Sequence, residues 1–594
     1  MPPAQTSRVH LTAAATSALP RWLLLALCII YGLSGLFLRD PWKNEDAAGF
    51  GVMWTLAQGG VQDWLLPNIV GRPHIEDGPL VFWIGALMIK LFGWLLGAAD
   101  AARLSTALFF FVTCASIWYG AYLLGRRAEV QPFEFAFGGQ PKARDYGRTL
   151  ADGALLIFLA CVGLAQRGHE TTAQVGQMYC IALMLYGLIR SLDKPNQGAL
   201  WLGLGLGAFG LASGPVMPLV LTASLLLATW VCPQRSWRRV LSISLPLALA
   251  IVLAWFAAAY FGADERSDAV AFIREWSRFD RRMYGVPVPE VLGFIARNLL
   301  LYTWPVWPLA IWAWHSWDGM RRAPHIVLPL ALLLPQLVLL AMQQTGGDMQ
   351  YILLLPPLAM LATFGLPTLK RSIINAIDWF AVFSFTILCG FVWLIWIAKL
   401  TGYPPKIARN VYRLLPGYVP EFSVIALIAA LLVTAAWILI VRWRVSRAPK
   451  MIWRSVVISA AGATLMWVLM MTLWLPTINY GKTYRDVAEA AAMALPSTYQ
   501  CVQPIRMGDA QLASFAYFGH IRFGGPEDNC DVLLRHDPQN YGEPTSVSRF
   551  QWRLIWEGRR PSDRDERFRM YHLQPLAEKP SRAPSFSDIR RRRH

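Results

Sequence analysis

Two adjacent carboxylates, Glu45 and Asp46, follow the first long apolar run of the chain. That run, residues 22–38, is long enough with its flanks to cross a membrane. A carboxylate at a membrane surface can accept a proton from a substrate or hold a cation, and such positions often belong to functional sites. The pair also fits two solvated charges on a loop. The segments around it must decide between the two interpretations.

The composition is that of a polytopic membrane protein. Of 594 residues, 55% are hydrophobic, 15% are charged and 27 are Trp, and the mean hydropathy is positive. In a soluble protein, a net charge of +18 would suggest a nucleic-acid partner. Here Lys and Arg gather in short loops between apolar runs and in the tail, so membrane topology explains the charge and no nucleic-acid partner is expected.

Apolar runs predict about thirteen transmembrane helices. They cover residues 22–38, 104–125, 149–166, 175–190, 202–212, 215–231, 240–261, 291–314, 326–342, 351–369, 379–398, 422–441 and 456–475. The first run lacks a small-residue cleavage site after it, so we interpret it as a retained anchor with a cytoplasmic N-terminus.

One further apolar run, residues 80–97, carries Lys90 near its centre. If it spanned the membrane, the basic loop at residues 126–148 would face outside. If it lies along the surface, that loop joins the other basic loops in the cytoplasm, as the positive-inside rule favours. Lys90 would then extend toward head groups or bind a lipid phosphate. Thirteen spans place the C-terminus outside.

This topology places four segments on the external face: residues 40–98, the turn at His169–Glu170, residues 262–290 and everything after residue 477. In the first of these, the pattern predicts a short helix over residues 47–58, a break at Gly59–Gly60 and the surface helix. We expect the four segments to converge, with the first loop folded as a lid.

The C-terminal part divides into residues 477–576, which read as a small soluble α/β domain, and a disordered basic tail at residues 577–594. Residues 1–476 form the transmembrane domain. Cys501 and Cys530 are the only cysteines of the soluble domain. In an oxidising space they should form a disulfide, and otherwise they are two buried thiols.

Short motifs along the first 370 residues resemble, in order and spacing, those of the GT-C glycosyltransferases. The branch is the one that contains the lipid A aminoarabinose transferases and the protein O-mannosyltransferases. The motifs are Glu45-Asp46, residues 61–64 with Pro67, residues 77–83, Arg103, residues 211–215, residues 275–279, residues 302–305 and residues 351–356. The resemblance implies a GT-C type polytopic α-helical membrane protein with periplasmic juxtamembrane helices and a small C-terminal soluble α/β domain.

The same resemblance implies a sugar donor linked to polyprenyl phosphate and a site in a bacterial inner membrane that faces the periplasm. The acceptor would be a lipid such as lipid A, a glycan or a protein, and the enzyme would act as a monomer. The catalytic base corresponds to Glu45, or to Asp46 after a one-residue shift, and direct displacement would invert the anomeric centre. Glu170 corresponds to an acidic residue near the acceptor, with Gln174 as the competing alignment.

The family arginine that binds the phosphate of the sugar donor corresponds to Arg278. His169, Glu275 and Asp348 are candidates for binding or orienting the acceptor. Three family lysines are missing, at Asp77, at Ser213 and near Gly347–Asp348. Positive charge must then come from other residues, and the candidates are Arg278, Arg72, Arg103 and Lys90. Otherwise a divalent cation held by Glu76 and Asp77 would supply it.

Two other classes fit the layout of spans. A transporter or flippase would typically show internal repeats and mid-membrane charges, whereas the centres of these spans carry almost no charges. A non-catalytic scaffold or sensor is consistent with the missing lysines. No nucleotide-binding glycine loop or zinc-spaced Cys/His set occurs in the sequence.

Overall fold

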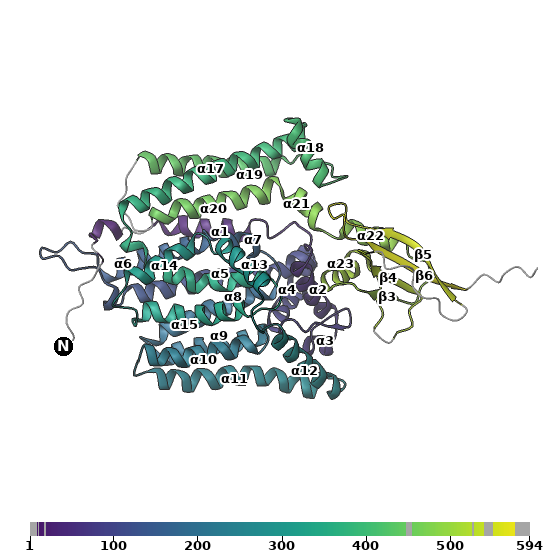
Figure 1. The fold of residues 1–594 in the computed structure, drawn as a ribbon, viewed down its shortest axis with the longest axis horizontal. Coiled ribbons are helices and arrows are strands. Elements are labelled where there is room, and N and C mark those ends of the chain that lie inside the picture. Colours follow the sequence, from purple (N-terminus) through teal and green to yellow (C-terminus); the bar gives the residue numbers. More distant parts are fainter. Residues whose placement is uncertain are drawn as a thin grey trace, which may run out of the picture.

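Long helices form a broad bundle, and a small domain with a sheet projects from one end of it (Figure 1). This computed structural model describes residue 9 and residues 11–16, 19–446, 454–525, 528–539 and 550–575. The predicted tail at residues 577–594 lies outside the described residues.

Each of the thirteen predicted runs falls on a helix or on a helix with one break. These elements are α1 (Arg21–Leu33), α5 (Ala98–Gly125), α6 (Ala143–Leu159) with α7 (Val162–Arg167), α8 (Ala173–Ser191), α9 (Pro195–Ala212), α10 (Val216–Val231), α11 (Trp237–Gly262), α13 (Pro289–Tyr302) with α14 (Val306–Ser316), α15 (Pro324–Ala341), η3 (Met349–Leu354) with α16 (Leu355–Thr363), α17 (Arg371–Thr401), α19 (Val424–Ser446) and α20 (Arg454–Leu473). Within the described residues, seven helices are long and apolar enough to cross a membrane. The chain is therefore a multi-pass helical membrane protein, and the count of thirteen spans stays a prediction.

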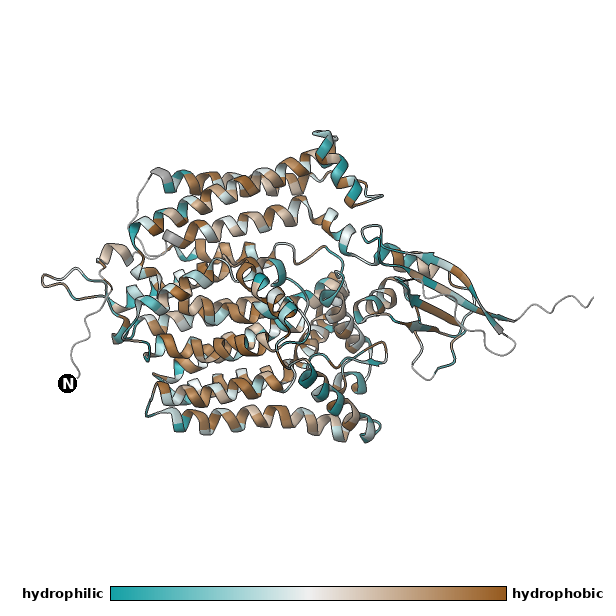
Figure 2. Cartoon of the chain, viewed as in Figure 1, coloured by the Kyte–Doolittle hydropathy of each residue, from teal (hydrophilic) through white to brown (hydrophobic). Residues whose placement is uncertain are grey.

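The helices of the bundle consist mostly of hydrophobic residues, coloured brown in Figure 2. Trp230 on α10, Phe383 on α17 and Ile425 on α19 are exposed. Apolar surface of this extent is unfavourable in water and favourable against lipid. The bundle thus has a surface suited to a bilayer.

The predicted first loop is folded and lies at the end of the bundle that carries the small domain (Figure 1). It contains α2 (Glu45–Gln58), α3 (Val61–Leu65), the antiparallel pair β1 (Asn68–Ile69) and β2 (Arg72–Pro73), and α4 (Leu80–Leu96). The predicted break at Gly59–Gly60 separates α2 from α3. Helix α4 keeps one face buried and exposes Leu91 and Trp94, as expected for a helix along a membrane surface.

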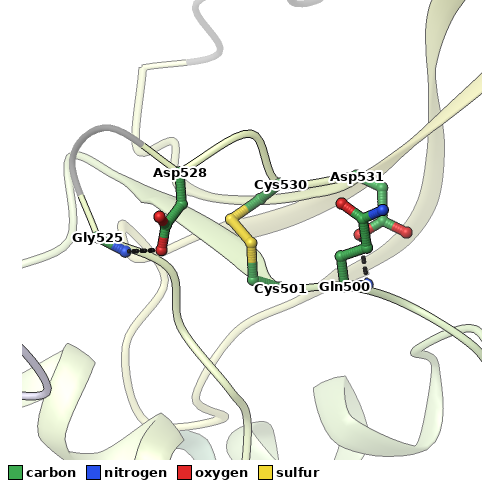
Figure 3. The surroundings of a disulfide bond; sticks show 6 residues. All are labelled: Gln500, Cys501, Gly525, Asp528, Cys530 and Asp531. Atoms are coloured by element: carbon green, nitrogen blue, oxygen red, sulfur yellow. Dashed lines mark hydrogen bonds between the residues drawn. A yellow bond between two sulfur atoms is a disulfide. The ribbon is translucent and has the colours of Figure 1, made fainter.

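The C-terminal segment forms the predicted small domain, with a mixed four-stranded sheet. Its elements are α21 (Leu475–Lys482), α22 (Arg485–Met493), β3 (Val502–Ile505), α23 (Asp509–Gly519), β4 (Val532–His536), β5 (Phe550–Gly558) and β6 (Phe568–Pro575). The strand order is β3-β4-β6-β5, with β3 and β4 parallel and the other pairs antiparallel. Cys501, just before β3, and Cys530, just before β4, form a disulfide (Figure 3).

Two amphipathic helices, α12 (Arg266–Arg282) and α18 (Pro405–Leu414), lie at the same end of the bundle (Figure 1). Helix α23 packs on α2, and Asp40 and Arg485 form an ion pair between the first loop and the small domain. The small domain therefore covers the segment that carries the acidic pair.

Candidate active site

The two adjacent carboxylates at the start of α2 have opposite environments. Asp46 is fully buried, and one of its oxygens lies 2.7 Å from Nη1 of Arg39. Its carboxylate also accepts hydrogen bonds from the backbone N–H of Trp42 (2.8 Å) and of Thr171 (2.6 Å). Glu45 is exposed and, within the described part of the chain, has no hydrogen-bond or ion-pair partner. Successive residues of a helix point about 100° apart, which separates the two side chains.

Asp46 is held in its ionised form. Burial alone would raise the pKa of Asp46, but the charges of Arg39 and Arg103 and the hydrogen bonds from Arg39 and Trp42 lower it to about 2. A carboxylate with so low a pKa and so many fixed hydrogen bonds is a poor proton acceptor. Asp46 therefore positions the loop and α2, and Glu45 is the member of the pair that can meet a substrate.

Glu170 belongs to a second cluster, in the turn between α7 and α8. Its two carboxylate oxygens lie 2.9 and 3.1 Å from Nη1 of Arg167, and the same guanidinium binds Asp348 at 2.5 Å. The hydroxyl of Tyr302 donates to Asp348 at 2.6 Å. Burial raises the pKa of Glu170 to about 7, although the charge of Arg167 lowers it. The predicted Glu170 and Asp348 thus meet through one arginine.

The turn that carries Glu170 is joined directly to the acidic pair. Thr171, whose N–H binds Asp46, is the next residue, and a side-chain carbon added at Gly49 of α2 would lie 2.1 Å from the carbonyl oxygen of Thr171. Only glycine allows this close approach. The two clusters therefore form one site at the end of the bundle that carries the small domain.

A residue that the sequence analysis missed, Lys482 at the end of α21, joins this site. Its Nζ lies 4.5 Å from the centre of the Trp42 ring, over which the Arg39 guanidinium also lies at 4.0 Å. Its carbonyl oxygen accepts the N–H of Lys43 at 2.9 Å. A signal was present, because Lys482 closely follows the last predicted span. No motif marked it.

Two of the four predicted phosphate-binding cations are engaged in the structure. Arg103 is 1% exposed and donates to the carbonyl oxygen of Arg39 (2.7 Å) and to Asp100 (2.6 Å). The prediction for Arg103 therefore does not fit: its guanidinium supports the loop that holds Arg39. Arg72 donates to the carbonyl oxygen of Pro504 at 3.0 Å, which links the first loop to β3.

The other two predicted cations lie on exposed helices. Arg278 on α12 pairs with the predicted Glu275 one turn earlier at 2.7 Å, and both side chains are nearly half exposed. Glu275 also lines a pocket of about 600 Å³ between α12 and the first loop. Lys90 on α4 is exposed, with its Nζ 5.5 Å from the centre of the Trp64 ring. None of these contacts joins them to the acidic pair.

His169, predicted to orient the acceptor, belongs to the core. Its ring stacks on Trp467 with 4.2 Å between centroids, and its Nε2 donates to the carbonyl oxygen of Tyr31 at 2.9 Å. Burial lowers the pKa of His169 to about 4, so the ring is neutral. Its backbone carbonyl, which accepts from Arg39 at 2.9 Å, is what links this residue to the site.

The predicted cation ligands Glu76 and Asp77 do not form a metal site with further ligands. Asp77 accepts a hydrogen bond from the Gln177 amide at 2.9 Å, and neighbouring His74 binds Asp509 at 2.8 Å through Nδ1. Burial raises the pKa of Asp77 to about 6. Among the described residues, no group of three or more His, Cys, Asp or Glu side chains could hold a metal ion. The structure offers Glu76 and Asp77 no third ligand.

The multi-pass bundle, the folded first loop and the small mixed-sheet domain together form the same fold as ArnT, as the sequence resemblance predicted. The chain is similar to ArnT from Cupriavidus metallidurans bound to undecaprenyl phosphate, with a TM-score of 0.65 and 16% identity over 93% of this chain and 97% of that one. For ArnT from the same organism in the apo state, the TM-score is 0.65, with 15% identity over 94% of this chain and 98% of that one.

The Archaeoglobus fulgidus oligosaccharyltransferase in the apo form gives a TM-score of 0.44 and 11% identity over 85% of this chain and 65% of that one. No family model and no curated protein matches the sequence.

Proposed function

We propose that this protein is an integral membrane glycosyltransferase that moves a sugar from a polyprenyl-phosphate-linked donor to an acceptor on the periplasmic side of a bacterial inner membrane. The shared fold with ArnT, whose crystal structure holds undecaprenyl phosphate, supports the choice of sugar donor. The acceptor is a lipid such as lipid A, a glycan or a protein, and the enzyme acts as a monomer.

The observation that carries the proposal is the difference in environment between Glu45, which is exposed, and Asp46, which is buried. A carboxylate that is exposed and unpaired within the described chain is accessible to a substrate proton, whereas its neighbour is held in a buried ion pair. If the pair were only two solvated charges on a loop, neither of the two adjacent acids would have to be fully buried.

In the proposed reaction, an acceptor hydroxyl or amine attacks the anomeric carbon of the sugar and loses its proton to Glu45. The bond from that carbon to the phosphate oxygen breaks, and the polyprenyl phosphate leaves with the bonding electrons. One displacement of this kind inverts the anomeric centre and needs no covalent enzyme intermediate. Because phosphate is a good leaving group, no strong general acid is required.

Glu170 and Asp348 act as positioning residues in this proposal. Arg167 ties them together, and the N–H that follows Glu170 holds Asp46. Glu170 and Asp348 therefore fix the position of the turn beside the first residues of α2, where the acceptor would enter.

The proposal is tested by titrating the purified protein in lipid nanodiscs with undecaprenyl phosphate and recording bound lipid by native mass spectrometry. We expect saturable binding of one molecule that survives an excess of phosphatidylglycerol, used as an anionic control lipid. Binding no stronger than that of phosphatidylglycerol would contradict the choice of sugar donor and would favour a scaffold or sensor.

A further inference from the structure

Most of the charged side chains at the proposed active site are engaged in ion pairs with one another. Arg39 pairs with Asp46 at 2.7 Å, and Arg167 pairs with Glu170 at 2.9 Å and with Asp348 at 2.5 Å. These guanidiniums are fixed by carboxylates of the protein itself. A phosphate bound by either guanidinium would compete with these carboxylates for the positive charge.

Two charged groups at the same place remain outside these pairs. One is the carboxylate of Glu45, and the other is the ammonium of Lys482, which has no ion-pair or hydrogen-bond partner within the part of the chain that the structure describes. The backbone bond from Lys43 N–H to the Lys482 carbonyl, 2.9 Å long, places Lys482 beside the segment that leads into Glu45.

The position of the Lys482 ammonium is defined although it lacks an anion. It lies over the Trp42 ring, its side chain is only partly exposed, and its charge is attracted by Glu170 and Asp46 and repelled by Arg167 and Arg39. A partly buried ammonium without a counter-ion is unfavourable, so a bound anion would be stabilised there.

We infer that the ammonium of Lys482 binds the phosphate of the polyprenyl-phosphate-linked sugar and remains bound to it as it leaves. This inference rests on the proposed function. It makes the C-terminal domain a part of the active site, because α21, and not one of the helices of the first 370 residues, supplies the cation.

Nearby cations fit this role less well. Lys43 lies 3.6 Å from Asp563 of the small domain, and Arg72 is bound to the carbonyl oxygen of Pro504. Arg278 is paired with Glu275 on α12. Each of these already has an acceptor, whereas Lys482 has none among the described residues.

The test is the undecaprenyl-phosphate titration of the wild type, Lys482→Met, Lys482→Arg and the matched exposed-lysine control Lys406→Met on α18. We expect Lys482→Met to weaken binding by about tenfold or more, which corresponds to at least ~1.4 kcal/mol. Lys482→Arg and Lys406→Met should each stay within about threefold of the wild type, because the charge near the phosphate is kept in both. Melting temperatures report folding, and Lys482→Gln replaces the Met variant if that one does not fold.

Equal binding by the wild type and the folded Met or Gln variant would overturn the inference and leave the proposed function standing. If the wild type itself failed to bind undecaprenyl phosphate, the proposed function would fail instead. A tenfold loss in Lys406→Met as well would also contradict the inference, because the effect would then follow net charge rather than position.

Discussion

At the scale of single residues, two neighbouring carboxylates at the start of one helix have opposite environments. Asp46 neutralises the buried Arg39 and receives two backbone N–H groups, whereas Glu45 faces outward at the start of the same helix. The sequence indicated the pair but not these environments. These depend on Thr171, which lies 125 residues further along the chain.

Removing the charge of Asp46 should destabilise the fold. Asp46→Asn leaves the Arg39 guanidinium buried without a counter-charge, a change that typically costs about 3–5 kcal/mol. Thermal unfolding in detergent at neutral pH measures it, and the double variant Arg39→Met, Asp46→Leu should recover part of the loss. Because the pKa of Asp46 is lowered to about 2, its contribution to stability is complete above the unfolded value of 3.8 and is lost as the pH falls toward 2. An Asp46→Asn protein as stable as the wild type would show that the ion pair contributes nothing.

Two of the four predicted cations, Arg103 and Arg72, are engaged by other parts of the protein. Whether an arginine is free depends on partners far away in the sequence: Arg103 meets the carbonyl of Arg39, and Arg72 meets Pro504. Local charge patterns carry no information on such contacts, and they gave no reason to choose Lys482.

At the scale of elements, the hydropathy pattern located the helices well because lipid-facing surface has to be apolar. It missed breaks inside apolar runs. Residues 291–314 form two helices, α13 and α14, on either side of Thr303–Pro305, since Pro305 cannot donate a backbone hydrogen bond to continue the first helix.

The contact between the first loop and α23 should depend on pH. Burial alone would lower the pKa of His74, but its hydrogen bond to Asp509 and the charges of Asp77, Asp509 and Glu76 raise it above 6.5. The stabilisation is therefore complete below 6.5 and is lost as the pH rises through the raised value. Asp509 is 44% exposed, so the effect should be about 1 kcal/mol or less.

Hydrogen exchange of α2 and α23 at about pH 6 and about pH 8 measures this effect, since a free histidine changes charge between these values. We expect faster exchange at the higher pH after correction for the intrinsic rate. His74→Gln should remove the difference. Protection that is unchanged in the wild type between the two conditions would contradict a role for the His74 charge.

At the scale of the whole molecule, the C-terminal domain is the part that sequence reasoning placed least well. Its α/β character, its disulfide and its convergence with the first loop were predicted from the sequence, but its individual contacts with α2 were not. In the structure it lies on α2 and brings Lys482 to the carboxylate cluster. Docking surfaces of this kind depend on shape, which single-sequence patterns do not encode.

The central claim is that this protein transfers a sugar from a polyprenyl phosphate with Glu45 as the base. It is tested most directly by mass spectrometry of polyprenyl-phosphate sugars and of envelope lipids, glycans and proteins. The cells compared carry the wild type, Glu45→Gln or the matched exposed-carboxylate control Glu76→Gln.

We predict that Glu45→Gln, at unchanged protein level, accumulates one lipid-linked sugar and loses one glycosylated product, because removal of a general base typically slows a reaction by about 10²–10⁴-fold. The Glu76→Gln cells should match the wild type. Identical profiles in Glu45→Gln and wild-type cells would contradict the account and favour a scaffold or a transporter.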